Sequence, residues 1–110
     1  MIWKYKKGKF RYWSNNGWRQ SKGSSYTCYP FTIHKKVWHD GTLGKRWVIS
    51  HIATGREVGN FRLLRHAKQC AEEIEHPSFL MSTSEQILSS LSETDSKNKI
   101  MRIINHHSAK

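Results

Sequence analysis

The 110-residue sequence predicts an α+β fold, an antiparallel β-sheet of about five to six strands packed on one amphipathic helix. Two observations predict it. Over roughly the first sixty residues, short runs of β-branched and aromatic residues alternate with Gly-containing turns, which is typical of antiparallel strands. Residues 62–75 then repeat apolar residues at spacings of three and four, which is typical of a helix. We expect a sheet-and-helix domain over residues 1–76 and a short helical extension over residues 77–110.

The first strands are expected close to the N-terminus. Residues 2–6 and 10–13 flank a predicted turn at Lys7-Gly8, and Asn15-Asn16-Gly17 is a hairpin signal that leads into a third strand. Residues 21–30, SKGSSYTCYP, are polar, rich in Gly and Ser and closed by Pro. This composition predicts a loop between two hairpins.

Three further strands are expected before the helix. Residues 31–39, FTIHKKVWH, and residues 46–53, RWVISHIA, are rich in β-branched and aromatic residues and flank a turn with two glycines. Thr54-Gly55 then turns the chain into a short strand over residues 56–61. The sheet is therefore expected to be mostly antiparallel.

The predicted helix runs from about Arg62 to Glu75 and ends at His76-Pro77. Its basic residues stand in the first half and its acidic residues in the last turns, which opposes the helix macrodipole at a cost of a few tenths to about 1 kcal/mol each. An anionic partner is one reason for such an arrangement. The apolar stripe consists of Leu63, Leu64, Ala67, Cys70, Ala71 and Ile74.

One or two short helices are expected after Pro77. Ser82-Thr83-Ser84-Glu85 fits a capping box, and residues 97–105 place Ile100, Met101, Ile103 and Ile104 on one apolar side. Helices this short are marginal alone, so we expect them to dock on the sheet, to pair with a second copy in a homodimer, or to stay partly disordered.

The charge of the chain is concentrated in its first part. Residues 1–68 hold fifteen Lys and Arg against two acids, a net +13, and residues 69–110 hold four against six, a net −2, which together give +11. A positive field of this kind favours nucleic acid, an acidic protein or an anionic membrane surface, and in some proteins it serves solubility alone. No apolar run is long enough to span a bilayer, and the N-terminus lacks the apolar region of a secretory signal. We expect a cytoplasmic protein without a membrane partner, in which Cys28 and a partly buried Cys70 are free thiols.

Basic and aromatic residues are interleaved through the N-terminal half. Bases bind phosphates and aromatic rings offer stacking faces, so the pattern favours nucleic acid. We expect DNA as the partner more than RNA, although this pattern does not distinguish the two. The expected phosphate contacts are Lys4, Lys6, Lys7, Lys9, Arg11, Arg19, Lys35, Lys36, Lys45, Arg46 and Arg56. The expected stacking or wedge residues are Trp13, Trp18 and Trp38.

A family resemblance supports this expectation. A strand, the Thr54-Gly55 turn, a second strand ending in Val58-Gly59-Asn60-Phe61 and a helix carrying Ala67 and Ala71 follow one another within residues 31–74. This order resembles the three-stranded-sheet-plus-helix DNA-binding domain of plant ethylene-response factors and of the arm-site-binding domains of tyrosine-recombinase integrases. In that family a Gly-x-Phe segment ends the third strand, and small Ala residues let the helix lie close to the sheet.

The resemblance implies a binding mode as well. The exposed sheet face of that family enters the DNA major groove, and the matching positions here are Lys36, Trp38, Arg46 and Arg56. The sequence departs from the family pattern in the extra strands before residue 31, in the helices after Pro77 and in a more apolar second strand.

Catalysis is not expected. A His-Asp pair, an Asn and a helical His occur in the order used by metal-dependent nucleases, but Asn60 and His66 lie too close together, and no second ligand follows at helical spacing. The residues concerned are His34, His39, Asp40, His51, Asn60 and His66. Phosphate loops, nucleophile elbows and paired carboxylates in the sheet region are missing, so we expect neither an enzyme nor a cofactor or metal site.

The leading prediction is therefore a small basic nucleic-acid-binding protein, an accessory or regulatory factor of bacterial or phage origin. The alternative is a small phage-type inhibitor that binds a host nuclease, polymerase or defence complex, and a metal-dependent nuclease is the remote alternative. The two differ in salt dependence, since an inhibitor with an apolar interface core would tolerate salt better than a phosphate-binding protein.

Overall fold

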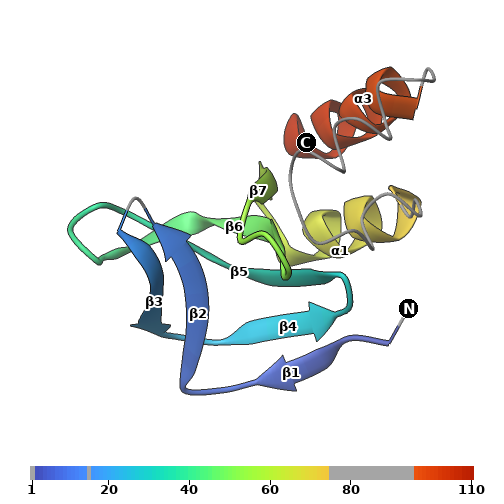
Figure 1. Cartoon of the computed structure of the whole chain (residues 1–110). Coiled ribbons are helices and arrows are strands. Elements are labelled where there is room, and N and C mark those ends of the chain that lie inside the picture. The colour runs from blue at the N-terminus through green and yellow to red at the C-terminus, as the bar shows by residue number, and fades with distance from the viewer. Residues whose placement is uncertain (1, 15, 75–95) are drawn as a thin grey trace.

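Seven strands and two helices make up the part of the chain that the computed structural model describes, residues 2–14, 16–74 and 96–110. Figure 1 shows a five-stranded antiparallel sheet in the order β1-β4-β5-β6-β7, a two-stranded sheet β2-β3, and helices α1 and α3. The elements are β1 (Lys4–Lys6), β2 (Lys9–Ser14), β3 (Gly17–Lys22), β4 (Ser25–Cys28), β5 (Phe31–Val37), β6 (Leu43–His51), β7 (Glu57–Phe61), α1 (Leu64–Glu73) and α3 (Ser96–Ser108). The predicted α+β class is confirmed.

The first four strands form one long antiparallel ribbon that bends sharply in its middle. β1 pairs with β4 and β2 pairs with β3 in a single continuous register. The bend lies where Gly8 and Gly23 face each other: the Gly23 N–H donates to the Gly8 carbonyl at 3.0 Å, and both have positive φ, 112° and 143°. Residues with a Cβ rarely adopt such angles. The two glycines therefore allow the outer half of the ribbon, β2–β3, to cross the sheet instead of extending it (Figure 1).

This ribbon corrects two predictions. Lys7-Gly8 does not reverse the chain between two paired strands, because β1 pairs with β4 and not with β2. Ser25–Cys28 is not a loop but strand β4, which lies between β1 and β5. Its polar residues form a strand because neighbours on both sides supply backbone hydrogen bonds, and local composition does not report such distant pairing.

Helices α1 and α3 pack on one face of the five-stranded sheet. Side chains alternate along a strand, so Phe31 and Ile33 of β5 point to the helices and His34 points away. Gly59 lets α3 approach β7 closely, since a Cβ there would lie 2.9 Å from Cγ2 of Ile104. The buried core consists of Phe31, Ile33, Ile49, Phe61, Ala67, Cys70, Ala71, Ile74, Ile100 and Ile104.

The last helix docks against α1 and β7, which is one of the three predicted options, and it is longer than predicted at both ends. Met101 is 46% exposed, so its predicted place on the apolar side is wrong. The predicted capping box at residues 82–85 and the helix after it lie outside the described residues. No helix of the described ranges is long and apolar enough to cross a membrane.

The acidic end of α1 has partners inside the protein. The Trp3 indole N–H donates to Glu72 Oε1 at 3.3 Å, and Glu73 Oε1 lies 3.0 Å from Nε2 of the buried His107 on α3. These contacts tie α1 to the N-terminus and to α3. They give the acidic end of the helix a structural role that offsets its unfavourable place in the macrodipole.

Candidate nucleic-acid interface

The sheet face opposite the helices is covered by the distal hairpin, the name used here for β2–β3. At its base the Phe10 ring stacks on His34, with ring centroids 4.4 Å apart and planes 16° apart. At its tip Trp13 and Trp18 lie against Gly55 in the β6–β7 turn, where a Cβ would come within 2.5 Å of Trp13 Cβ and 3.0 Å of Trp18 Cη2. The hairpin therefore touches the sheet at its base and at its tip.

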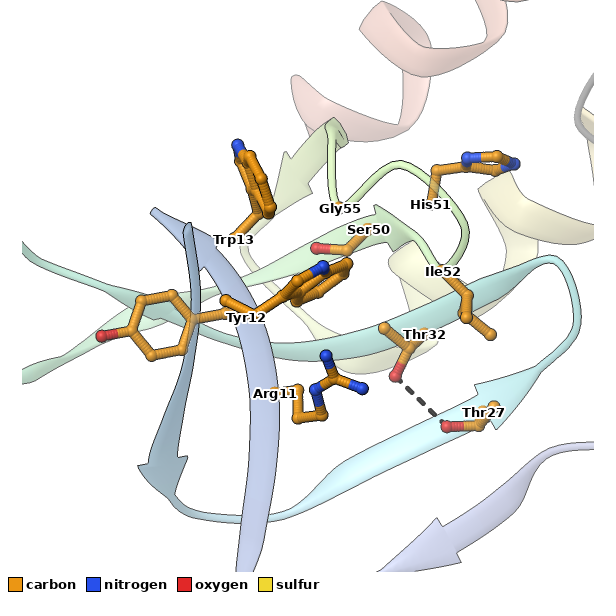
Figure 2. A pocket seen from close by; sticks show the side chains of 10 residues that line it. Arg11, Tyr12, Trp13, Thr27, Thr32, Ser50, His51, Ile52 and Gly55 are labelled. Atoms are coloured by element: carbon orange, nitrogen blue, oxygen red, sulfur yellow. Dashed lines mark hydrogen bonds between the residues drawn. The ribbon is translucent and has the colours of Figure 1, made fainter. Parts of the chain in front are cut away.

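A hollow of about 320 Å³ opens beside the tip and is called the tip groove here (Figure 2). The hairpin side of the groove is formed by Arg11, Tyr12, Trp13 and Trp18. The sheet side is formed by Thr27, Thr32, Ser50, His51, Ile52 and Gly55. A second hollow of about 220 Å³, the flanking hollow, shares Tyr12, Trp13, Ser50 and Gly55 with the groove and adds His34, Lys36, Val37, Val48, Arg56 and Glu57. Tyr12 and Trp13 thus stand between two hollows.

A cation and two indoles meet at the tip groove. The guanidinium carbon of Arg11 lies 4.7 Å from the Trp18 ring centroid, and the Trp13 and Trp18 rings meet edge to face at 5.4 Å and 79°. Figure 2 shows the Arg11 side chain reaching from β2 toward Thr27 and Thr32. Trp13 and Trp18 stay 47% and 41% exposed, although aromatic side chains contribute most when buried. Because Arg11 has no hydrogen-bond or ion-pair partner among the described residues, its N–H groups are available to a ligand.

The sheet side of the groove presents hydroxyl oxygens. His34 Nδ1 lies 2.8 Å from the Lys35 carbonyl, which only accepts, so Nδ1 carries the proton and Nε2 accepts from the Ser50 hydroxyl at 3.1 Å. Burial lowers the pKa of His34 and keeps this ring neutral. Because the Ser50 O–H donates to His34, the lone pairs of Ser50 Oγ remain available to accept a hydrogen bond. Thr27 Oγ1 and Thr32 Oγ1 share a hydrogen bond of 3.2 Å nearby.

Three of the predicted phosphate contacts are engaged within the protein. Lys35 Nζ donates to the Lys45 carbonyl at 2.9 Å and lies 4.3 Å from the Trp47 ring centroid. Lys36 Nζ forms a 3.0 Å ion pair with Glu57. Arg46 bonds to Asn60, through Nε at 2.5 Å and Nη2 at 3.3 Å, and to the Ser108 carbonyl at the end of α3 at 3.2 Å. These cations have structural roles whether or not they also meet a phosphate.

The remaining predicted cations are exposed and, apart from the Arg11–Trp18 stack, their side chains have no partner among the described residues. They lie on the edge strand β1 and at the bend, on the distal hairpin, and on β6 and the β6–β7 turn. They are Lys4, Lys6, Lys7, Lys9, Arg11, Arg19, Lys45 and Arg56.

The structure gathers only part of the predicted site around the two hollows. Arg11, Trp13 and Trp18 line the tip groove, and Lys36 and Arg56 line the flanking hollow. The other predicted residues line neither, and Trp38, 53% exposed, lies beyond the end of β5. Sequence reasoning missed Thr27, Thr32, Ser50 and Gly55 as lining residues, because only the bend of the ribbon brings them to the hairpin.

The histidines of the described ranges do not gather at a common metal site. Over the described ranges, no three His, Cys, Asp or Glu side chains are close enough to hold a metal ion. His34 is bound to Ser50 and to a backbone carbonyl, and His51 Nδ1 lies 2.9 Å from Thr54 Oγ1. These two rings serve packing and hydrogen bonding here.

Strands β5, β6 and β7 are followed in the chain by α1, and the face of these strands opposite α1 is the one that the distal hairpin covers. The four positions expected to contact a DNA major groove fall into two groups in the structure. Lys36 and Arg56 line the flanking hollow, whereas Trp38 and Arg46 line neither hollow. No protein-family model, curated protein or solved structure matches this chain.

Proposed function

We propose that this protein binds nucleic acid through the distal hairpin and the basic surface around it, as a small accessory or regulatory factor of bacterial or phage origin. The observation that carries the proposal is the tip of the hairpin. There Arg11 stacks on Trp18 beside a half-exposed Trp13, so a cation suited to phosphate and two half-exposed indoles occupy one place. Proteins that hold nucleic acid without reading a fixed sequence combine these two elements.

The charge around the tip supports the same proposal. Residues 1–61 contain two acids, Asp40 and Glu57; Asp40 accepts from the Thr42 hydroxyl at 2.6 Å, and Glu57 is paired with Lys36. Neither acid neutralises the unpaired cations of the edge strand, the bend and the hairpin. An uncompensated positive surface attracts a polyanion and releases its counterions on binding.

The test is a titration of labelled single-stranded DNA, duplex DNA and RNA across a salt series. Binding through about five cations should give a logarithmic salt slope near −3.5 on a single strand, at about −0.7 per phosphate. Micromolar or tighter binding at physiological salt is the expected result. Weak binding that disappears at that salt for all three forms would overturn the proposal, and a salt-tolerant, stoichiometric protein partner would then favour the inhibitor alternative.

A matched pair of variants locates the binding surface. Lys7→Ala/Lys9→Ala removes two cations beside the bend, and Lys99→Ala/Arg102→Ala removes two exposed cations from α3. Both variants lower the net charge equally, so a diffuse field would respond alike to either. The proposal predicts that the first flattens the slope by about 1.4 on a single strand and that the second leaves it unchanged.

A further inference from the structure

We propose that the tip groove holds one unpaired nucleotide, so that the protein selects single-stranded over duplex nucleic acid. The base lies against the indoles of Trp13 and Trp18, and its phosphate meets Arg11. This inference rests on the proposed nucleic-acid function and adds to it the form that is bound. The proposed binding mode is a pocket for one base, in place of the major-groove contact that the family resemblance implies.

The dimensions of the groove favour a single base. At about 320 Å³ it stands at the low end of the range of roughly 300 to 1,000 Å³ that small-molecule sites occupy. It lies between a two-stranded hairpin and the sheet, and the hairpin tip rests on Gly55. This space accepts one flat ring system and is too small for a helix or a duplex. In a duplex the bases are stacked inside and cannot enter without leaving the stack.

The groups that line the groove match the parts of a nucleotide. The Arg11 guanidinium offers donors in a planar fork, which is the geometry that suits a phosphate. Because the Ser50 O–H donates to His34 Nε2, the lone pairs of Ser50 Oγ remain available, and they suit the exocyclic amino group of cytosine or adenine. Indole rings supply a stacking face to any base. A cation, an acceptor and two indole side chains are thus placed around one cavity.

The flanking hollow gives the chain a way to continue. It shares Tyr12 and Trp13 with the tip groove and is lined by Arg56, whose side chain has no partner among the described residues. The tip groove has Arg11 and the flanking hollow has Arg56, with Trp13 lining both. A strand that places one base in the tip groove can therefore set its neighbouring phosphate near Arg56.

The experiment compares a single-stranded deoxycytidine decamer with a decamer of the same phosphate backbone that carries no bases. Both probes have the same charge, so phosphate binding alone cannot separate them. Stacking of one base predicts an intact-to-abasic affinity ratio of about fivefold to more than a hundredfold for the wild-type protein. A duplex of the same length should bind more weakly per strand than the intact decamer.

Variants place the effect in the groove. Trp18→Ala should reduce the intact-to-abasic ratio at least fivefold, and Trp18→Phe should retain most of it, because Phe keeps a stacking face. Trp38→Ala removes another half-exposed indole outside the groove and should leave the ratio unaltered. Arg11→Ala and Arg19→Ala each remove one positive charge from the same hairpin. Only Arg11→Ala should weaken binding of the intact decamer by more than the loss of one phosphate contact.

The outcomes separate this inference from the proposed function. An intact-to-abasic ratio near one, together with tight and salt-dependent binding of both probes and of duplex, overturns the nucleotide pocket and leaves nucleic-acid binding standing. A failure of the wild-type protein to bind any probe at physiological salt overturns both. A high ratio that responds to Trp18→Ala and not to Trp38→Ala supports the pocket. Because the probe comparison uses the unaltered protein, a variant that fails to fold does not decide the question.

Discussion

Replacing Gly55 with alanine should detach or strain the tip of the distal hairpin, and the size of the effect follows from two separate costs. Gly55 has φ of 73°, a left-handed conformation that costs a residue with a Cβ about 1–2 kcal/mol. The added methyl group would also lie 2.5 Å from Trp13 Cβ and 3.0 Å from Trp18 Cη2. The clash is with a Cβ near the backbone, so a rotamer change of Trp13 does not relieve it.

Overpacking of this kind typically costs about 1–3 kcal/mol. The hairpin can avoid the clash only by lifting its tip, which gives up the contacts of Trp13 and Trp18 with the sheet. The expected loss in the free energy of unfolding for Gly55→Ala is therefore about 2–5 kcal/mol in total, the sum of strain and clash.

Gly41→Ala is the matched control. Gly41 has φ of 86°, and no described heavy atom beyond its chain neighbours lies within 4 Å of the Cβ position, so this variant carries the backbone cost without the clash. Urea unfolding followed by tryptophan fluorescence and by circular dichroism should show that Gly55→Ala lowers the free energy of unfolding by about 1–3 kcal/mol more than Gly41→Ala does. In thermal unfolding the same difference corresponds to about 4–12 °C in Tm. Equal losses for the two variants would refute the docking of the tip on the β6–β7 turn.

Three further predictions concern the core and α3. Burial lowers the pKa of His34 from its ordinary 6.5, so below pH 6.5 the unfolded chain takes up a proton that the folded chain resists. The urea concentration at the unfolding midpoint should therefore decrease as the pH is lowered from about 6.5 to the folded pKa of His34. His34→Gln should flatten this decrease. Burial raises the pKa of the Cys70 thiol to about 12, so a thiol reagent should modify half-buried Cys28 in the native protein and Cys70 only on unfolding; equal rates would contradict the buried position. Arg46→Ala should lower the free energy of unfolding by about 1 kcal/mol, because α3 loses its hydrogen bond to this exposed guanidinium. The neighbouring Lys45→Ala should change it by no more than about 0.5 kcal/mol. Equal changes for the two variants would show that the Arg46 hydrogen bonds contribute nothing.

The fold class could be predicted because its signals are local. The stripe of Ala67, Cys70, Ala71 and Ile74 has helical spacing, and it is the buried face of α1. The predicted strands at residues 31–39 and 46–53 correspond to β5 and β6, apart from shifts of a few residues at their ends. Strand β4 escaped prediction because its sequence, SYTC, is stabilised by pairing with β1 and β5, and such pairing leaves no periodic pattern in the polar residues around it.

The candidate site was predictable only as a set of residue types. Interleaved bases and aromatics pointed to Arg11, Trp13 and Trp18, but the groove depends on the continuous register of the ribbon and on the bend at Gly8 and Gly23. A Lys-Gly pair between two short strands is far more common as a turn than as a bend in an unbroken ribbon, so composition favoured the wrong geometry. The sequence also could not show that Lys35, Lys36 and Arg46 form hydrogen bonds within the protein, since each partner is ten or more residues away in the chain.

The most direct test of the central claim is to follow the indole N–H signals by NMR while a single-stranded oligonucleotide is added at physiological salt. The tryptophans report on different places: Trp13 and Trp18 at the tip groove, Trp38 beyond the end of β5, and Trp3 and Trp47 against the core. The account predicts that the signals of Trp13 and Trp18 shift together with saturation and that the other three move little. Shifts confined to other indoles, or no shift at concentrations that saturate binding, would contradict it.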